Sequence, residues 1–230
     1  NEIKNLISLL SKCNLNLNKV ILKSYVEGID LIYSEKKETF FKIIIYKDKI
    51  KLIYFYNSAF CFYQNFNFGS DIILKDIAKV CSLKFSNIQK LISNKDFDIS
   101  KNSDQIIDKD FFKNENPKKI SLKHVNDISA ARIDEIVKII FKNNKSLDIY
   151  KLEDYSLSLY FEDKDILKKF KKDFQDNFDN QNIFFEILPE NNILNFINIF
   201  GDLLSKGWVK EAIPVINKKK SWITRLFSKI

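Results

Sequence analysis

The stretch that decides the fold is TFFKIIIYKDKIKLIYFYNSAFCFYQNFN, residues 39–67. Most of its residues are β-branched or aromatic, and they form three runs at 39–46, 50–56 and 59–67. Such residues favour β-strands because their side chains pack well on a pleated surface. The breaks at 47–49 and 57–58 are short and polar, so they suit tight turns. The stretch therefore predicts a three-stranded β-meander.

Helices and further strands are expected on both sides of the meander, from the spacing of apolar residues. We expect helices at 2–12, 24–34, 71–81, 85–93, 163–177 and 191–205, a helix from the N-cap Asp127 to about Asn143, and strands at 19–23, 155–161 and 183–188. Three strands followed by alternating helices and strands is the order of a ribonuclease-H-like half domain. That unit is duplicated in actin-like proteins, so the sequence predicts an α/β, actin-like fold.

Residues 94–123 interrupt this order with a polar, lysine-rich segment. Thirty structureless residues would be unusual inside a compact domain, so we expect a small inserted subdomain with a weak hairpin or two. The predicted organisation has an end of a first half domain at 1–36, a second half domain at 37–93 and 124–207, the insert at 94–123 extending into 71–150, a linker at 208–217 and a terminal helix at 218–230.

Composition excludes several classes of function. The chain has 230 residues, of which 45% are hydrophobic, which suits a globular protein. Cys13, Cys61 and Cys81 are widely spaced, so we expect buried, reduced thiols. With His124 as the single histidine, placed by expectation on the surface, neither a zinc site nor histidine catalysis is predicted. No apolar run reaches the roughly 18 residues that span a bilayer. The first residues, beginning at Asn1, suggest a processed or truncated chain without a signal peptide.

The basic charge is concentrated at the end of the chain. Residues 206–230 contain seven Lys and Arg residues and one acid, so they carry +6 of the net charge of +8. This location argues against a nucleic-acid binder, because no basic, aromatic-rich face is evident elsewhere.

The terminal sequence KKKSWITRLFSKI, residues 218–230, combines cations with an apolar helical face. It could be a core helix, a helix that docks on a partner protein, or an interfacial membrane helix. Tryptophan near one end, aliphatic residues and Phe on one face, cations beside them and no acid favour the membrane helix. The predicted membrane-binding residues are Lys218, Lys219, Lys220, Trp222, Ile223, Arg225, Leu226, Phe227, Lys229 and Ile230.

Four segments resemble the FtsA family of bacterial cell-division proteins. FNFGSDIILKDIAKVCSL (66–83) is similar to the family's segment after its third strand, with Asp76-Ile77-Ala78 intact and Leu74 in place of a Thr. ISAARIDEIVKIIF (128–141) resembles its Arg-x-x-Glu helix, which places Arg132 and Glu135 on the matching positions. Residues 3–33 resemble the helix-strand-helix that closes the first half domain, and SWITRLF (221–227) resembles the membrane-targeting helix.

The chain departs from the family where nucleotide phosphates bind. Actin-like proteins hold phosphates in glycine-rich turns, because only a bare backbone approaches the anion closely. The turn between the first two strands here reads IIIYKDKIKL, and the later loop reads YFEDKDI, both without glycine. Gln89 and Ile92 replace a Glu and a Lys near the base. Only Gly69, Ser70 and Gln89 are left as weak candidates for nucleotide contacts.

We therefore expect no enzyme activity, no metal site and no cofactor, with ATP and Mg²⁺ binding only if further N-terminal residues restore a site. Asp48 and Asp163 lie near the two altered loops, and exposed turn positions explain them more simply than Mg²⁺ binding. The resemblance implies a peripheral protein at the cytoplasmic face of the inner membrane that tethers filaments of FtsZ and can self-associate. Arg132 and Glu135 are candidate FtsZ contacts, with an exposed helical salt bridge as the simpler explanation. A membrane scaffold similar to the pilus-assembly protein PilM and an active actin-like ATPase stay open.

Overall fold

The computed structural model describes residues 2–17, 20–94, 104–107, 112, 119–150, 154–178, 183–188, 193–203 and 205. The chain divides into two compact units, one of residues 1–34 with 193–230 and one of residues 35–192. The predicted linker 208–217, the terminal helix 218–230 and most of the predicted insert lie outside the described residues.

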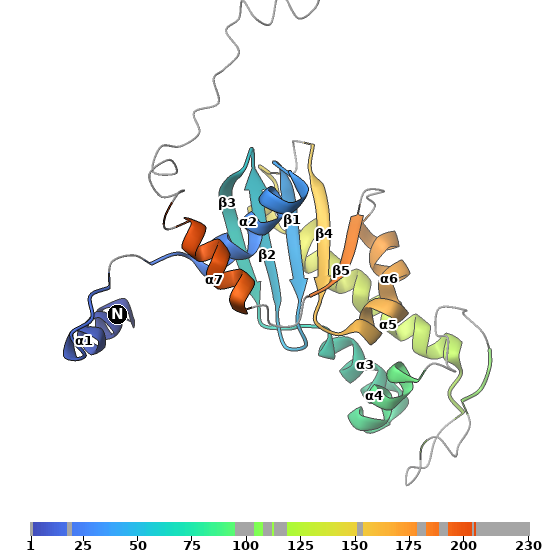
Figure 1. The fold of residues 1–230 in the computed structure, drawn as a ribbon. Helices are drawn as coiled ribbons and strands as arrows, with labels where there is room; N and C mark the ends of the chain where they lie inside the picture. The colour runs from blue at the N-terminus through green and yellow to red at the C-terminus, as the bar shows by residue number, and fades with distance from the viewer. Residues whose placement is uncertain are drawn as a thin grey trace, which may run out of the picture. The chain divides into compact units, whose positions relative to one another are not determined.

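The larger unit is built on a five-stranded mixed sheet with the order β3-β2-β1-β4-β5 (Figure 1). Its strands are β1 (Phe40–Ile45), β2 (Ile50–Tyr56), β3 (Ala59–Phe66), β4 (Ser156–Phe161) and β5 (Ile183–Ile187). β2 pairs antiparallel with both β1 and β3, whereas β4 pairs parallel with β1 and with β5. Only β2 therefore runs against the others, and the predicted meander and both later strands are confirmed.

Two tight turns shape the meander. Between β2 and β3, Asn57 and Ser58 have φ values of 48° and 66°. Positive φ at both central residues is the requirement of the two-residue hairpin turn whose twist matches that of its strands, and Asn tolerates it well. The β1–β2 turn is closed by the amide of Tyr46, which donates to the carbonyl of Lys49 at 2.9 Å.

Four helices, α3 (Asp71–Cys81), α4 (Phe85–Ser93), α5 (Leu122–Val137) and α6 (Lys164–Phe178), pack with one face of the sheet to form the main core. Every second residue of β1 and β2 faces this core, as the two-residue repeat of a strand requires. Phe41 lies at its centre, with ring centroids 4.3 Å from Tyr54, 5.2 Å from Phe141 and 4.9 Å from Tyr155. The sheet is therefore fixed against the helices by large aromatic contacts.

Two of the predicted elements were wrong in detail. α5 begins at Leu122, because Ser121 is its N-cap and accepts a hydrogen bond from the His124 amide at 3.2 Å. Asp127, the predicted N-cap, lies inside the helix. Buried Leu122 and Val125 extend the apolar stripe one turn earlier, so the helix gains core contacts by starting there. The predicted strand 19–23 is also absent from its described part, since 20–22 are irregular and Lys23 begins the next helix.

The described ends of the insert pair with each other. Ile106 and Ser121 form an antiparallel bridge, and the amide of Ile107 donates to the carbonyl of Ile120 at 2.9 Å. Ile107, Phe112 and Ile120 are buried in the main core. The expected inserted subdomain and its hairpins stay predictions, and the described residues Ile107, Phe112 and Ile120 belong to the core of the larger unit.

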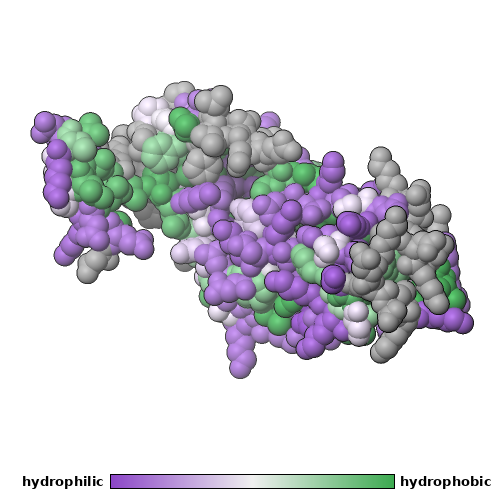
Figure 2. Space-filling view, turned by 90° about the horizontal axis from the view of Figure 1, so that it is seen from below, coloured by the Kyte–Doolittle hydropathy of each residue, from purple (hydrophilic) through white to green (hydrophobic). Residues whose placement is uncertain are grey.

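The smaller unit contains α1 (Glu2–Lys12), α2 (Lys23–Glu35) and α7 (Ile193–Asp202). Val26 and Ile29 of α2 pack with Leu203 beyond α7. In α1, four apolar residues are exposed: Ile3, Leu6, Ile7 and Leu9. Figure 2 shows green, hydrophobic residues beside purple, hydrophilic ones on the surface seen from below. α7 thus groups with the N-terminal helices, and the predicted half-domain boundaries stay predictions. No described helix is long and apolar enough to cross a bilayer.

Candidate functional site

The candidate site lies where β1 and β4 end. These neighbouring parallel strands finish side by side at Ile45 and Phe161, and the amide of Glu162 donates to the carbonyl of Ile45 at 3.0 Å. After β1 the chain continues towards the β3 edge of the sheet, whereas after β4 it continues towards the β5 edge. In open α/β sheets, ligands bind outside the carboxyl ends of strands at such a switch point. The carboxyl ends of β1 and β4 are therefore the candidate ligand site of this sheet.

One side of this edge is formed by the β1–β2 turn packed against the start of α3. The amides of Ser70 and Asp71 donate to the carbonyls of Tyr46 and Lys47 at 2.9 and 3.0 Å. Gly69 makes this approach possible, because a Cβ there would lie 2.5 Å from the Lys47 carbonyl oxygen. The next two amides of α3 donate to the carbonyls of Gly69 and Ser70. The backbone amides in the first turn of α3 thus donate hydrogen bonds to carbonyl groups of the chain itself, although amides at such a helix start can also bind an anion.

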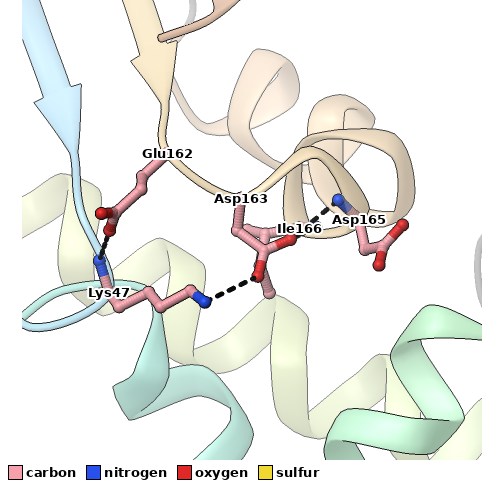
Figure 3. A network of polar contacts seen from close by, with 5 residues as sticks. All are labelled: Lys47, Glu162, Asp163, Asp165 and Ile166. Carbon is pink, nitrogen blue, oxygen red and sulfur yellow. Dashed lines mark hydrogen bonds and ion pairs between the residues drawn. The ribbon is translucent and has the colours of Figure 1, made fainter. Parts of the chain in front are cut away.

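The other side is formed by Glu162 and Asp163 in the loop between β4 and α6 (Figure 3). The Glu162 carboxylate accepts a hydrogen bond from the Lys47 amide at 2.8 Å. The Asp163 carboxylate accepts from the amides of Asp165 and Ile166 at 2.9 and 3.3 Å, and it lies 4.0 Å from the Lys47 ammonium. Asp163 is therefore the N-cap of α6, and both loops are joined through side-chain carboxylates.

These carboxylates accept hydrogen bonds from backbone amides in a turn and at a helix N-terminus. Backbone amides in a turn and at a helix N-terminus bind anions. Here, Glu162 accepts from the turn and Asp163 accepts from the helix. A triphosphate entering this edge would have to displace both carboxylates and would meet their negative charge.

Asp71 adds to the acidic character of the edge. Burial raises the pKa of its carboxyl group, which Lys75 and Lys47 oppose and Asp163 and Asp48 reinforce. Asp71 and Asp163 thus lie close enough to interact electrostatically. No group of three or more metal-ligating side chains is placed for a metal ion within the described ranges.

The weak nucleotide candidates are distributed over two helices. Gly69 and Ser70 are buried at the start of α3, where they serve the contact with the β1–β2 turn, and Gln89 is exposed on α4. The role of Glu162 was missed in the sequence, because a single acid after a strand gives no motif. The position of Glu162 directly after β4, in the loop that corresponds to a phosphate loop of the family, was the feature of the sequence that could have indicated this role.

A second candidate surface lies on α3 and α5. The guanidinium of Arg132 contacts the carboxylates of Asp76 and, at 2.7 Å, Glu135. The predicted helical pair between Arg132 and Glu135 is therefore formed, and Asp76 extends it to a neighbouring helix. Glu135 keeps 54% of its side chain exposed, whereas Arg132 keeps 25%.

The thiols and the histidine differ partly from expectation. Cys81 is buried and burial raises its pKa, whereas Cys13 and Cys61 are exposed, so the prediction of buried thiols was wrong for those two. All three are free, and His124 is exposed as expected. Cys61 lies exposed on the edge strand β3, and the spacing of cysteines along the chain does not reveal this.

No protein-family model matches the sequence, and no curated protein sequence matches it. Among solved structures, an archaeal actin homolog has 12% identity and a TM-score of 0.48 and matches over 83% of this chain and 57% of its own. The ethanolamine utilization protein EutJ from Carboxydothermus hydrogenoformans has 8% identity and a TM-score of 0.47. The match covers 77% of this chain and 53% of EutJ. A chain of the PilM-PilN type IV pilus biogenesis complex has 8% identity and a TM-score of 0.44. The match covers 81% of this chain and 47% of that one. The chain spans about half the length of these proteins, and likeness of this degree concerns the fold only.

The class of the protein follows from the sheet itself. The sheet has a meander followed by two parallel strands, and β2 alone runs in the reverse direction. Helices connect β3 to β4 and β4 to β5. This is the topology of a ribonuclease-H-like half domain. The larger unit therefore has the α/β, ribonuclease-H-like half-domain topology that the sequence predicted. At the carboxyl edge of β1 and β4, the carboxylates of Glu162 and Asp163 accept hydrogen bonds from backbone amides of the two loops.

Proposed function

We propose that this protein is an FtsA-like scaffold that tethers FtsZ filaments to the cytoplasmic face of the cell membrane and that it does so without binding nucleotide. The observation that carries the scaffold part is the carboxylate-filled edge of β1 and β4. Glu162 accepts from the β1–β2 turn and Asp163 accepts from the start of α6. An actin-like unit that satisfies these amides itself has a stable loop arrangement without a phosphate ligand.

The nucleotide part has a direct test. Thermal unfolding of the full-length protein is measured with and without millimolar MgATP, because a ligand that binds the native state raises the midpoint. We expect no shift. A variant that combines Glu162→Gln and Asp163→Asn removes the negative charge but keeps hydrogen-bonding side chains, so it shows whether charge alone excludes the ligand. A clear rise in the midpoint of the unaltered protein would support the ATPase interpretation instead.

The membrane part rests on the sequence of residues 218–230. Five apolar residues recur there at helical spacing, and the same segment contains five cations. Each cation near an anionic leaflet contributes about 1 kcal/mol. Burial of an apolar side chain contributes about 1.5 kcal/mol or more. Together these contributions support reversible, peripheral attachment, which clustering on a filament would strengthen.

Flotation with vesicles tests the membrane part. The intact chain is compared with a chain that ends at Asn217 and with a full-length variant carrying Trp222→Glu and Phe227→Glu. We expect the intact chain to float with vesicles that contain anionic lipid and both altered chains to remain at the bottom. Equal flotation of all three would contradict a terminal anchor, and loss of flotation at high salt alone would indicate charge without insertion.

The partner part centres on Glu135 and its neighbour Arg132. Glu135 presents a half-exposed carboxylate beside the α3–α5 contact. Vesicles bearing the intact chain are mixed with FtsZ filaments, and the recruited FtsZ is measured. We expect Glu135→Lys to reduce recruitment while flotation stays unchanged, with Ser86→Lys on α4 as a matched control at an exposed position. Binding of a pilus peptide in place of FtsZ would favour the PilM-like alternative.

A further inference from the structure

The exposed face of α6, which packs beside β4 and β5, is formed by lysines at helical spacing (Figure 1). Four exposed side chains share this face, and we call them the α6 lysine stripe: Lys164, Lys168, Lys171 and Lys172. From the geometry of an α-helix, they fall within an arc of about 100° and extend over about 12 Å along its axis. The opposite face of α6 is held in the main core by Phe170 and Phe174. The stripe therefore points to solvent.

The stripe keeps its positive charge. All three acids of α6 fall outside the arc, and no carboxylate of a described residue lies within 4.0 Å of a stripe ammonium. The exposed Lys138 on α5 differs, since it lies 2.6 Å from the carboxylate of Asp134. Lys171 has an aromatic contact, with its ammonium 5.3 Å from the ring centroid of Phe185, and such a contact leaves its charge in place. One face of α6 thus presents four cations that no neighbouring carboxylate neutralises.

The composition of the stripe favours an anionic lipid surface over a protein or a nucleic acid. Protein interfaces are depleted in lysine, and their binding energy comes largely from buried aromatic residues and arginine. Proteins that bind single-stranded nucleic acid add aromatic rings on which bases stack. The arc of the stripe contains neither kind of residue, and its remaining exposed side chain is Gln175. Anionic headgroups, in contrast, attract lysines near a membrane surface without a fitted pocket.

We propose that the α6 lysine stripe lies against anionic lipid headgroups and gives the folded unit a membrane contact of its own. The inference rests on the proposed peripheral attachment, because four lysines alone correspond to a dissociation constant on the order of 1 mM. An anchor at the end of the chain raises the local concentration of headgroups and makes this weak contact effective. With two contacts, the unit is held at the surface in a preferred orientation.

This orientation leaves the proposed partner residues out of the membrane contact. Arg132 on α5 contacts Asp76 on α3 and Glu135 on its own helix, whereas the stripe belongs to α6. The membrane contact and the partner contact therefore use different helices of the same unit. Substitutions in the stripe can thus be studied without altering Glu135.

Protection of lysines from acetylation tests the contact without relying on the terminal segment. The full-length chain carries an added C-terminal histidine tag and is attached to nickel-chelating vesicles, either of phosphatidylcholine alone or with added phosphatidylserine. We expect acetylation of the stripe to slow at least about threefold on the anionic vesicles. The exposed Lys75 and Lys79 on α3 are expected to react equally on both. Equal reactivity of the stripe on both vesicles overturns the proposal, as does protection that requires added FtsZ filaments in place of anionic lipid.

Charge reversal provides a second test, with the untagged full-length chain and vesicles that contain phosphatidylserine. Lys168→Glu combined with Lys172→Glu is expected to weaken the apparent affinity at least about tenfold. Lys75→Glu combined with Lys79→Glu makes the same charge change at exposed positions on α3, also four residues apart, and is expected to have less than about a twofold effect. Circular dichroism verifies that both variants are folded. Equal losses in the two variants indicate net charge alone and overturn the proposal.

The terminal anchor and the α6 contact fail separately in these experiments. An untagged intact chain that does not float, together with a protected stripe in the tagged chain, contradicts the anchor and supports the α6 contact. An intact chain that floats, together with a stripe that reacts equally on both vesicles, supports the anchor and overturns the α6 contact.

Discussion

The guanidinium of Arg132 on α5 contacts the carboxylate of Asp76 on α3. These two residues lie 56 positions apart in the chain, and each keeps only 25% of its side chain exposed. The same guanidinium donates to Glu135 at 2.7 Å. The contact joins the sequence stretches around Asp76 and around Arg132, so these residues have a structural role inside the molecule.

A double-mutant cycle measures this contact. Asp76→Ala, Arg132→Ala and the double variant are compared by chemical unfolding. Because the pair is partly shielded from water, we expect a coupling free energy of about 1 kcal/mol. The exposed pair Lys138 and Asp134, one helical turn apart at 2.6 Å, serves as the control and is expected to give about 0.3–0.5 kcal/mol. Equal coupling in both pairs would contradict a special role for the α3–α5 contact.

Gly69 is predicted to be intolerant of a side chain. In Gly69→Ala, the new Cβ would overlap the carbonyl groups of Tyr46 and Lys47, which are backbone atoms held in the β1–β2 turn. We expect a loss of about 2–3 kcal/mol in the free energy of unfolding. Gly201→Ala is the matched control, since nothing lies within 4 Å of its Cβ and the helix of α7 favours alanine, for a gain of up to about 1 kcal/mol.

Asp163 combines a capping contact with an ion pair, and two substitutions separate them. Asp163→Ala removes the acceptor for the amides of Asp165 and Ile166, so we expect a loss of about 1 kcal/mol in stability. Asp163→Asn keeps a capping oxygen but loses the attraction to Lys47, which at 4.0 Å is weak, so the loss is expected to be smaller. Unfolding in urea measures both, and a larger loss for the Asn variant would contradict capping as the main role.

The carboxyl group of Asp173 on α6 predicts a pH-dependent stability. Burial raises its pKa, the nearby Asp176 raises it further, and Lys172 opposes the shift. Folding therefore favours the protonated form, so this group's contribution is most favourable below its unfolded pKa of about 3.9 and is lost as the pH rises through the folded value.

Asp173→Asn is accordingly expected to be more stable than the parent at pH 7, by on the order of 0.5 kcal/mol, and equally stable near pH 3. Thermal unfolding at the two pH values checks the sign. A gain that is the same at both values would indicate an effect of packing rather than of ionisation.

Sequence patterns predicted the elements well where side-chain spacing decides the structure. β2 at 50–56 and the helices at 71–81 and 85–93 have the bounds expected from periodicity, because each buries a face with a clear repeat. The start of α5 was wrong because two capping residues were available. Ser121 forms the cap, since starting there buries Leu122 and Val125.

The candidate site was predictable only in part. The absence of glycine from both loops predicted loops unlike glycine-rich phosphate-binding turns, because that inference needs only local backbone freedom. The contact between the Lys47 amide and the Glu162 carboxylate was not visible in the sequence, since the two residues are separated by 115 positions and meet only when β1 pairs with β4.

By itself, the sequence determined the order of strands and helices from Thr39 onward, the meander and the concentration of charge at the end of the chain, because these depend on neighbours along the chain. The tertiary structure alone decided that β1 and β4 are parallel neighbours, that Glu162 and Asp163 satisfy the amides at their ends, and that β3 is an uncharged outer edge. Such relationships depend on which distant strands pair, and side-chain spacing within one segment carries no information about that choice.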